Sequence, residues 1–391
     1  MFTTIKSIFN SNLKNTERPT FLSEKKKTIL VIDDYIPYHD KSSGSKRLFE
    51  ITKLLKDLNL NVVFLPNDGL PTEPYYSELT ELGIYILLNN PSRKHLLSQL
   101  KSLLPYIDYA WISRPLLNNT YQKLIKRNSN AKIIFDTVDL HYLRMLRQAE
   151  NQSNKKLKRK ALQTKNLEVA LAHAAHATLT VTENEKLILE EENVNNVFVI
   201  PNIHELKIPS LSVPFTKRKG ILFIGGYKHD PNIDAVKWLI DEIIPVVWSK
   251  LGQIPVYLLG SNPTTEILNL ATENIIVPGY LQDVSDFFLN SRIFVAPLRY
   301  GAGMKGKIGQ SLEYGLPIVS TTIGTEGMNL IDGINVSCAD DTLGFANKMI
   351  ELYENEQLWS KIQQNSTQSL IAYTPDKVRQ QLKDLLNIID L

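Results

Sequence analysis

The sequence of 391 residues has little cysteine, no long apolar run and almost no net charge. The single cysteine, Cys338, excludes a disulfide within the chain and any metal site built from several cysteines, which is typical of proteins in a reducing compartment. Nowhere do about eighteen apolar residues follow one another, and the first residues lack the apolar core of a signal peptide. We therefore expect a cytoplasmic protein without a membrane span.

Charge of one sign is also lacking, because 44 lysines and arginines face 41 acidic residues and leave a net charge of +3. This balance argues against a partner made of nucleic acid. One segment departs from the average, since the residues between Glu150 and Glu168 include no acid. A solvated helix face is the ordinary interpretation of residues 155–165. The alternative is contact with anionic lipid at the inner face of a membrane, to which each cation contributes roughly 1 kcal/mol. The cations are Lys155, Lys156, Lys158, Arg159, Lys160 and Lys165.

Short β-rich apolar runs alternate with helical patterns along most of the chain, as in TILVID at 28–33 and KIIFDTVD at 132–139. Such alternation is typical of βαβ units in a parallel sheet. A second series of runs begins with ILFIGG at 221–226. The sequence therefore predicts the α/β class, with two tandem Rossmann-like, doubly wound domains.

Composition suggests where these domains begin and end. Residues 1–26 are polar and without a clear period, so we expect an N-terminal extension there. A Rossmann-like domain is predicted at 27–205, an interdomain linker at 206–219 and a second Rossmann-like domain at 220–374. Residues 375–391 form an amphipathic pattern that needs a partner surface. We expect this last helix to pack back on the N-terminal domain.

The most informative segment is RYGAGMKGK at 299–307, which follows an apolar run and contains three glycines and three cations. Glycines let a backbone approach a ligand closely, and the start of a helix presents free N–H groups and a positive dipole end. Arg299, Lys305 and Lys307 add positive charge. This combination is suited to binding a diphosphate.

The helix expected after this loop has one face that carries little side chain. Gly306 and Gly309 precede Glu313 by seven and four residues, so all three lie on one face. A ring-shaped group can lie there, and Glu313 would accept hydrogen bonds from two vicinal hydroxyls, as a ribose offers. The alternative interpretation is a solvated glutamate on a surface helix.

Residues 293–327 resemble the donor-binding signature of family-four (group 1) glycosyltransferases, which have the GT-B fold of two Rossmann-like domains facing a cleft, and the similarity covers roughly 28–375. The resemblance implies a retaining, metal-independent hexosyltransferase, and no metal site is expected. The nucleotide sugar would be a substrate, so no cofactor is expected, and the acceptor would be a glycan, a lipid-linked molecule or a protein. Glu313 would bind the ribose and Lys307 the phosphates.

The resemblance also implies further contacts with the donor. Gly225 and Gly226 would form the tight turn near the donor, and the main chain at Gly279 and Tyr280 would contact the nucleotide base. The 324–327 turn would approach the phosphates through Thr325 and Glu326. A plain turn is the alternative for each of these glycine-containing segments.

In the N-terminal half, Gly44 lies in a serine-rich loop that resembles the glycine loop of the family, where it would face the donor across the cleft. A helix cap without ligand is the alternative. His141 matches the family histidine that touches the donor sugar, with a histidine satisfied by one carboxylate as the alternative. Arg114, Asp139 and Arg144 are candidates for contacts with the acceptor.

Two departures from the family pattern keep a second hypothesis open. Lys305 stands where the family often has a glutamate that meets the donor sugar, and FIGGYKHDPN replaces a Gly-Arg and a later lysine. Lys228 and the cations of the 299–307 loop are expected to compensate. Otherwise the chain would be a catalytically silent GT-B subunit that binds or stabilises a partner glycosyltransferase, and a GT-B epimerase is a third possibility.

Overall fold

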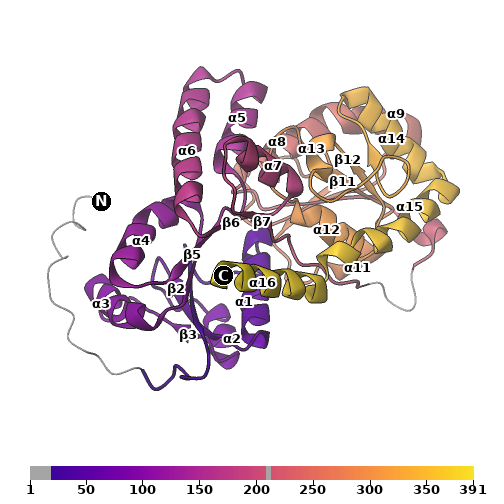
Figure 1. Ribbon diagram of the computed structural model, residues 1–391. Coiled ribbons are helices and arrows are strands. Elements are labelled where there is room, and N and C mark those ends of the chain that lie inside the picture. The colour runs from indigo at the N-terminus through magenta and orange to yellow at the C-terminus, as the bar shows by residue number, and fades with distance from the viewer. Residues whose placement is uncertain (1–18, 208–212) are drawn as a thin grey trace.

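The computed structural model describes residues 19–207 and 213–391. Most of the predicted extension 1–26 and the middle of the predicted linker therefore lie outside the described residues. Two parallel sheets, each with helices on both faces, lie one in each half of the chain (Figure 1). The predicted fold class, two tandem Rossmann-like domains, is confirmed.

The N-terminal domain contains a sheet of seven strands in the order β3-β2-β1-β4-β5-β6-β7. All pairs are parallel, and the β1–β2 register places Thr28 opposite Asn61. The strands are β1 (Thr28–Asp33), β2 (Asn61–Pro66), β3 (Tyr85–Ile86), β4 (Tyr109–Ser113), β5 (Lys132–Asp136), β6 (Ala177–Thr180) and β7 (Val197–Val199). The helices are α1 (Ser43–Asp57), α2 (Tyr75–Glu81), α3 (Arg93–Leu103), α4 (Pro115–Asn128), α5 (His141–Asn151), α6 (Lys155–Ala174) and α7 (Glu183–Glu191).

Helix α1 shows why these residues form a crossover helix. The Ser42 hydroxyl accepts the N–H of Ser45 at 3.2 Å and so caps the first turn. Leu48, Ile51 and Leu55 recur at helical spacing and are buried against the sheet. The cap fixes the start of the helix at the carboxyl end of β1, which is the edge where doubly wound sheets bind ligands.

The C-terminal domain contains a sheet of six strands in the order β10-β9-β8-β11-β12-β13. Its strands are β8 (Ile221–Ile224), β9 (Val256–Leu259), β10 (Ile275–Gly279), β11 (Ile293–Ala296), β12 (Ile318–Ser320) and β13 (Ser337–Cys338). The helices are α8 (Asp230–Trp238), α9 (Ile244–Leu251), α10 (Thr265–Leu268), α11 (Ser285–Asn290), α12 (Gly306–Glu313), α13 (Thr322–Thr325), α14 (Thr342–Glu354), α15 (Glu356–Ser369) and α16 (Pro375–Asp390).

Helix α16 leaves the C-terminal domain and lies beside α1 (Figure 1). Its apolar side chains belong to the same core cluster as Leu48 and Ile51 of α1. At its end, the Asp390 carboxylate accepts hydrogen bonds from Lys27 and Tyr109 at 2.7 Å. The prediction that the last helix packs back on the N-terminal domain is confirmed. The buried residues are Val378, Leu382, Leu385, Leu386 and Ile389.

The described end of the predicted extension packs on the N-terminal domain. Leu22 is buried in its core, and the Phe21 ring stacks on Tyr85 with 3.8 Å between ring centroids. The amide of Asn61 donates to the carbonyl of Ser23 at 2.9 Å. Within residues 19–207 and 213–391, no helix combines the length and hydrophobicity that crossing a membrane requires.

Candidate functional site

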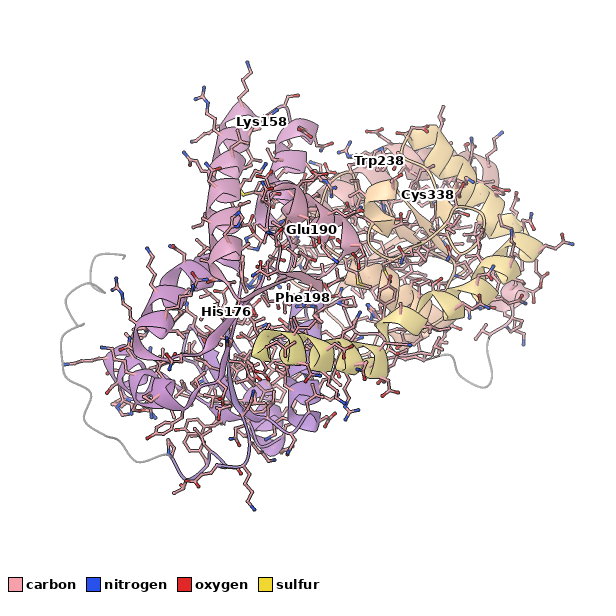
Figure 2. All side chains as sticks on the ribbon, in the orientation of Figure 1. Lys158, His176, Glu190, Phe198, Trp238 and Cys338 are labelled. Carbon is pink, nitrogen blue, oxygen red and sulfur yellow. The ribbon has the colours of Figure 1, made fainter. Side chains whose placement is uncertain are left out.

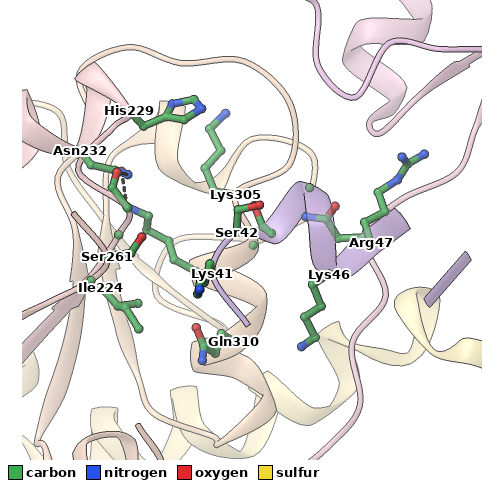
Figure 3. Close-up of a pocket in the computed structure, with 18 of the residues that line it drawn as sticks. Lys41, Ser42, Lys46, Arg47, Ile224, His229, Asn232, Ser261, Lys305 and Gln310 are labelled. Carbon is green, nitrogen blue, oxygen red and sulfur yellow. Dashed lines mark hydrogen bonds between the residues drawn. The ribbon is translucent and has the colours of Figure 1, made fainter. Parts of the chain in front are cut away.

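A cavity of about 710 Å³ lies between the two domains. Residues 39–47 line it from the N-terminal side, and residues 225–232 and 300–307 contribute to the opposite wall. Figure 3 shows side chains from both domains around it, including Lys41, Lys46 and Lys305. Both walls come from carboxyl ends of strands, so the cavity occupies the position where open α/β sheets bind ligands.

Several glycines at the cavity lie where a side chain would collide. A Cβ atom on Gly225 would lie 2.8 Å from Lys307 Nζ, and one on Gly303, whose φ is +66°, would lie 2.9 Å from the Cβ of Asp139. Gly44 differs, because its added Cβ would meet nothing closer than Val138 at 3.5 Å. Gly44, Gly225, Gly226 and Gly306 all line the cavity, which places these predicted residues together.

Lys307 lies in the first turn of α12 and reaches the cavity. Its Nζ donates to Asn232 Oδ1 at 2.5 Å and lies 4.3 Å from the centroid of the Phe223 ring. Burial, and then the charge of Lys305, lower the pKa of Lys307 to about 7. An incoming anion would compensate for the lost solvation, so this lysine is suited to bind a phosphate and to become fully charged when it does.

Lys305 is held by protein groups although it lines the cavity. Its Nζ donates to the carbonyl of Gly303 at 2.7 Å and lies 3.2 Å from the carboxylate of Glu326. Arg147, on α5 of the other domain, binds the same carboxylate through two hydrogen bonds of 2.7 and 2.8 Å. Burial alone would raise the pKa of Glu326, but the hydrogen bond from Arg147 and the charge of Lys305 lower it to about 2. These three side chains connect the domains.

Glu313, at the opposite end of α12, is fully buried and does not line the cavity. Its carboxylate lies 2.8 Å from Lys46 Nζ, 2.6 Å from His204 Nδ1 and 3.3 Å from Lys207 Nζ. Burial alone would raise the pKa of Glu313, but the hydrogen bond from His204 and the charge of Lys46 lower it to about 2. The solvated surface glutamate of the alternative interpretation is therefore wrong, because basic groups surround this carboxylate.

The glycine face of α12 is covered by the N-terminal domain and the interdomain segment. An added Cβ on Gly309 would lie 2.1 Å from His204 Nε2, and one on Gly306 would lie 2.3 Å from the Cβ of Ser43. We expected a ring-shaped ligand group on this face. In the structure the ring over Gly309 is the imidazole of His204, because the two domains are closed on each other.

Asp139 and Arg144 lie on the cavity wall, as the sequence predicts for acceptor-side residues. Asp139 is 3.1 Å from Arg144 Nε and 3.3 Å from His141 Nε2. Burial opposes ionisation of Asp139, but the hydrogen bond from His141 and the charge of Arg144 hold its pKa well below the usual range. His141 itself does not line the cavity. It contacts Asp139 instead, which matches the carboxylate-satisfied alternative.

Arg114 lines the cavity from the N-terminal domain and has a positive φ of 67°. Its Nε is 2.8 Å from Asp33 and 3.4 Å from Asp34. Coulombic attraction from Asp33 raises the pKa of Arg114 above its ordinary value. The guanidinium is therefore fixed at the carboxyl end of β1.

Four other predicted residues lie outside the cavity lining. Arg299 forms two hydrogen bonds with Asp234, at 2.9 and 2.6 Å, so its charge is directed to α8. Thr325 donates to the carbonyl of Thr322 at 3.1 Å within α13. Gly279, with a φ of +78°, forms the turn that brings its neighbour Tyr280 to the cavity, while Glu326 holds Lys305.

The sequence interpretation missed several residues that the structure brings to the site. His229 and Asn232 lie in the quoted FIGGYKHDPN segment, so their signal was the polar turn after β8. Lys46 follows the serine-rich loop directly, and its distance from Glu313 in the sequence hid their contact. No sequence feature pointed to His204, apart from its position near the end of the first domain. It bonds to a helix more than a hundred residues later.

These features define a GT-B architecture, in which two Rossmann-like domains enclose a cavity lined by glycines and cations. Residues 218–355 match the family described as glycosyl transferases group 1. This match confirms the predicted resemblance to group 1 glycosyltransferases over these residues, which are 138 of the 391 in the chain. A relative in Klebsiella pneumoniae, an uncharacterized 44.6 kDa protein in the cps region, is 25% identical over 165 residues. That match spans 40% of this chain and 42% of the Klebsiella protein, less than half of either.

Solved structures with the same fold cover nearly the whole chain. Sucrose-phosphate synthase from Thermosynechococcus elongatus has a TM-score of 0.69 at 13% identity, over 93% of this chain and 99% of its own. Anabaena Alr3699/HepE, in complex with UDP and glucose, has a TM-score of 0.71 at 12% identity, over 93% and 100%. S. aureus TarM, in complex with Fondaparinux, alpha-GlcNAc-glycerol and UDP, has a TM-score of 0.70 at 13% identity, over 92% and 100%. At these identities the likeness concerns the fold.

Proposed function

We propose that this chain is a retaining, metal-independent hexosyltransferase that binds a nucleotide-diphosphate sugar in the interdomain cavity. The observation that carries the proposal is the position of Lys307. It is a half-buried lysine with its pKa lowered to about 7, next to Gly225 and in the first turn of a helix that opens on the cavity. A diphosphate at this position would accept hydrogen bonds from the Lys307 ammonium group and from the free N–H groups of the helix.

Glycosyl transfer from such a donor needs stabilisation of the negative charge that grows on the departing diphosphate. Preorganised donors aimed at developing charge supply large rate enhancements. Lys307 and the start of α12 serve this role, while the sugar becomes oxocarbenium-like as its bond to the phosphate breaks. The acceptor hydroxyl attacks the same face of the sugar, and the leaving phosphate takes up its proton. No metal ion enters this proposal.

The acceptor would enter from the wall formed by Arg114, Asp139 and Arg144, which face the glycine loops across the cavity. Charged side chains fixed by ion pairs can bind hydroxyl groups without a large loss of conformational entropy. A glycan, free or carried on a lipid or protein, offers such hydroxyls. Since the HepE and TarM complexes contain UDP, uridine diphosphate sugars are the first donors to test.

A silent GT-B subunit is the second candidate, and a specific observation favours it. Lys46 binds Glu313 across the cleft, and Arg147 binds across the cleft to Glu326, which holds Lys305. An enzyme must release or share these contacts when it opens for substrate, whereas a silent partner can keep them permanently.

A panel of nucleotide sugars tests the proposal by thermal shift and by slow hydrolysis of the donor. We expect one class of nucleotide sugar to stabilise the protein and to be hydrolysed. The matched variant is Gly44→Leu, because an added side chain at this position enters the cavity with no protein atom closer than 3.5 Å to its Cβ. It should retain its thermal stability and lose the shift. Absence of binding by every donor would favour the silent subunit.

A further inference from the structure

The hairpin of α5 and α6 projects from the N-terminal domain as two adjacent helices (Figure 1). Its tip is the turn 152–154, and α6 begins directly after it at Lys155. Figure 2 shows Lys158 near this tip with side chains directed outwards. Residues 151–156 are all exposed. The tip is therefore a convex end that solvent surrounds.

Five cations lie within the first turn and a half of α6, and we call them the tip cations. They are Lys155, Lys156, Lys158, Arg159 and Lys160. All five are exposed, and none forms an ion pair or a side-chain hydrogen bond with another described residue. Lys165, one turn further along, is different because its Nζ pairs with Glu192 at 2.5 Å. The positive charge of Lys165, further along the hairpin, is thus paired with an acid, whereas the positive charges of the tip cations are not.

The position of the tip cations on the helix is unfavourable unless an anion is present. A helix N-terminus carries the positive end of the dipole and favours acidic side chains, but the first turn of α6 has none. The Asn154 side chain accepts the N–H of Leu157 at 3.0 Å, which satisfies one free donor without adding charge. Cations and helix dipole therefore present positive potential to the same side.

We propose that the tip cations dock the protein on an anionic lipid surface. Three features of the tip favour this partner. A convex end brings cations from several sides of the helix close to a plane, while a nucleic-acid strand is usually followed by cations along a groove with aromatic side chains for the bases. The segment that carries the tip cations, residues 151–160, contains no aromatic residue. Clusters of this size near a membrane bind anionic headgroups through summed electrostatic attraction.

Docking through this tip would also set the distance between membrane and cavity. Helix α5 starts next to the cavity wall at Asp139 and ends at Asn151 beside the tip. Its 11 residues span about 16 Å at 1.5 Å per residue. The cavity would therefore lie within reach of a sugar carried on a lipid. The docking itself does not depend on the proposed transferase activity.

Sedimentation of the full chain with vesicles tests the proposal. One set of vesicles contains phosphatidylcholine alone, and the other also contains about one third phosphatidylglycerol. Binding to each set is measured at low and at high salt. We expect binding to the anionic vesicles alone and its loss at high salt, because the contact is electrostatic. Replacing the five tip cations with glutamine should weaken vesicle binding by at least about 100-fold.

The matched control removes the same charge elsewhere. Lys217, Lys219, Lys250, Lys377 and Lys383 are exposed and form no ion pair with a described residue, so their replacement by glutamine should leave most vesicle binding intact. Thermal unfolding and donor binding of both variants should match the unaltered chain, which separates this proposal from the proposed function. Equal loss in both variants, salt-insensitive binding, no vesicle binding, or tighter binding to a single-stranded RNA than to vesicles would overturn the proposal.

Discussion

Helix α12 contains two pairs of a glycine and a charged residue, and the surroundings of the two pairs differ. At its start, Gly306 and Lys307 lie at a solvent-accessible cavity with room for a ligand. Toward its end, Gly309 and Glu313 are covered by His204 and Lys46. Glycine permits close approach at both positions, but Gly306 lines the cavity and Gly309 does not. The comparison shows that a glycine face indicates contact without indicating what makes the contact.

This difference assigns separate roles to the two charged residues. Lys307 is the residue proposed to bind the diphosphate of the donor, because it faces the cavity and burial lowers its pKa. Glu313 connects the domains in the closed arrangement, and binding of a ribose by its carboxylate would require Lys46 or His204 to give way. Substitutions at the two ends can therefore separate donor binding at one end from domain closure at the other.

The largest effect is expected at the start of the helix. Lys307→Ala should reduce kcat/KM for donor hydrolysis by about 100- to 1,000-fold, because one preorganised charge donor to the leaving group is lost. Turnover of the donor at fixed pH measures it. Lys250→Ala removes an exposed lysine of the same domain and should leave turnover unchanged. Equal activity of both variants would remove Lys307 from the site.

At the other end, Glu313→Gln should lower the free energy of unfolding by about 3 kcal/mol, because it leaves the surrounding basic groups without their buried carboxylate. Chemical denaturation measures the loss. The control is Glu266→Gln, which removes an exposed partner of Lys237 and should cost less than about 1 kcal/mol. A loss no larger than that of the control would contradict the closure role.

The pH dependence of this loss has a definite sign. The folded-state pKa of Glu313 is about 2, below its usual 4.5, so its stabilisation is present above pH 4.5 and disappears as the pH falls toward 2. The difference in stability between the unaltered chain and Glu313→Gln should therefore shrink below pH 4.5. A difference independent of pH would mean that the carboxylate charge is not what stabilises the closed domains.

Replacing a glycine of α12 with alanine adds one methyl group and so tests how closely His204 packs on that helix. Gly309→Ala places a Cβ 2.1 Å from His204 Nε2 and should destabilise the protein by about 1–3 kcal/mol through overpacking. Gly44→Ala adds the same methyl where the nearest atom is 3.5 Å away, so its melting temperature should not change. If both variants melt together with the unaltered chain, His204 does not lie over Gly309 in solution.

The smallest effect is a change of donor affinity with pH. Lys307 has a pKa of about 7 in the free protein, and a bound diphosphate favours its charged form. Donor affinity should therefore fall as the pH rises above 7, by at most about 10-fold per pH unit, with proton uptake on binding. Calorimetry in buffers of different ionisation enthalpy measures this uptake. Affinity that rises with pH would exclude a titrating Lys307.

Much of the fold could be predicted because the spacing of apolar residues and the glycines at strand ends can be recognised within short segments of the sequence. The alternation of runs predicted both sheets, and the stripe on α16 predicted its return to the first domain. The site was predictable where one segment carries its own chemistry, as at Gly306 and Lys307. The pairing of Glu313 with Lys46 joins residues 267 positions apart. No periodicity reports such a contact, because it depends on how the domains close.

Arg299 illustrates a second limit of sequence reasoning. Its place in the glycine-rich loop suggested countercharge for a diphosphate, but Asp234 on α8 binds it through two hydrogen bonds. A cation in a loop pairs with whichever anion the fold brings closest, and the sequence does not state that geometry. Lys305 follows the same rule, since Glu326 and the carbonyl of Gly303 hold its ammonium group.

The most direct test of the central claim is calorimetric titration of the unaltered chain and Lys307→Ala with the nucleotide sugar found in the screen. We expect one saturable site per chain, with affinity lost in the variant while its melting temperature stays close to that of the unaltered chain. Unchanged donor affinity in Lys307→Ala would contradict the claim that this end of α12 holds the diphosphate.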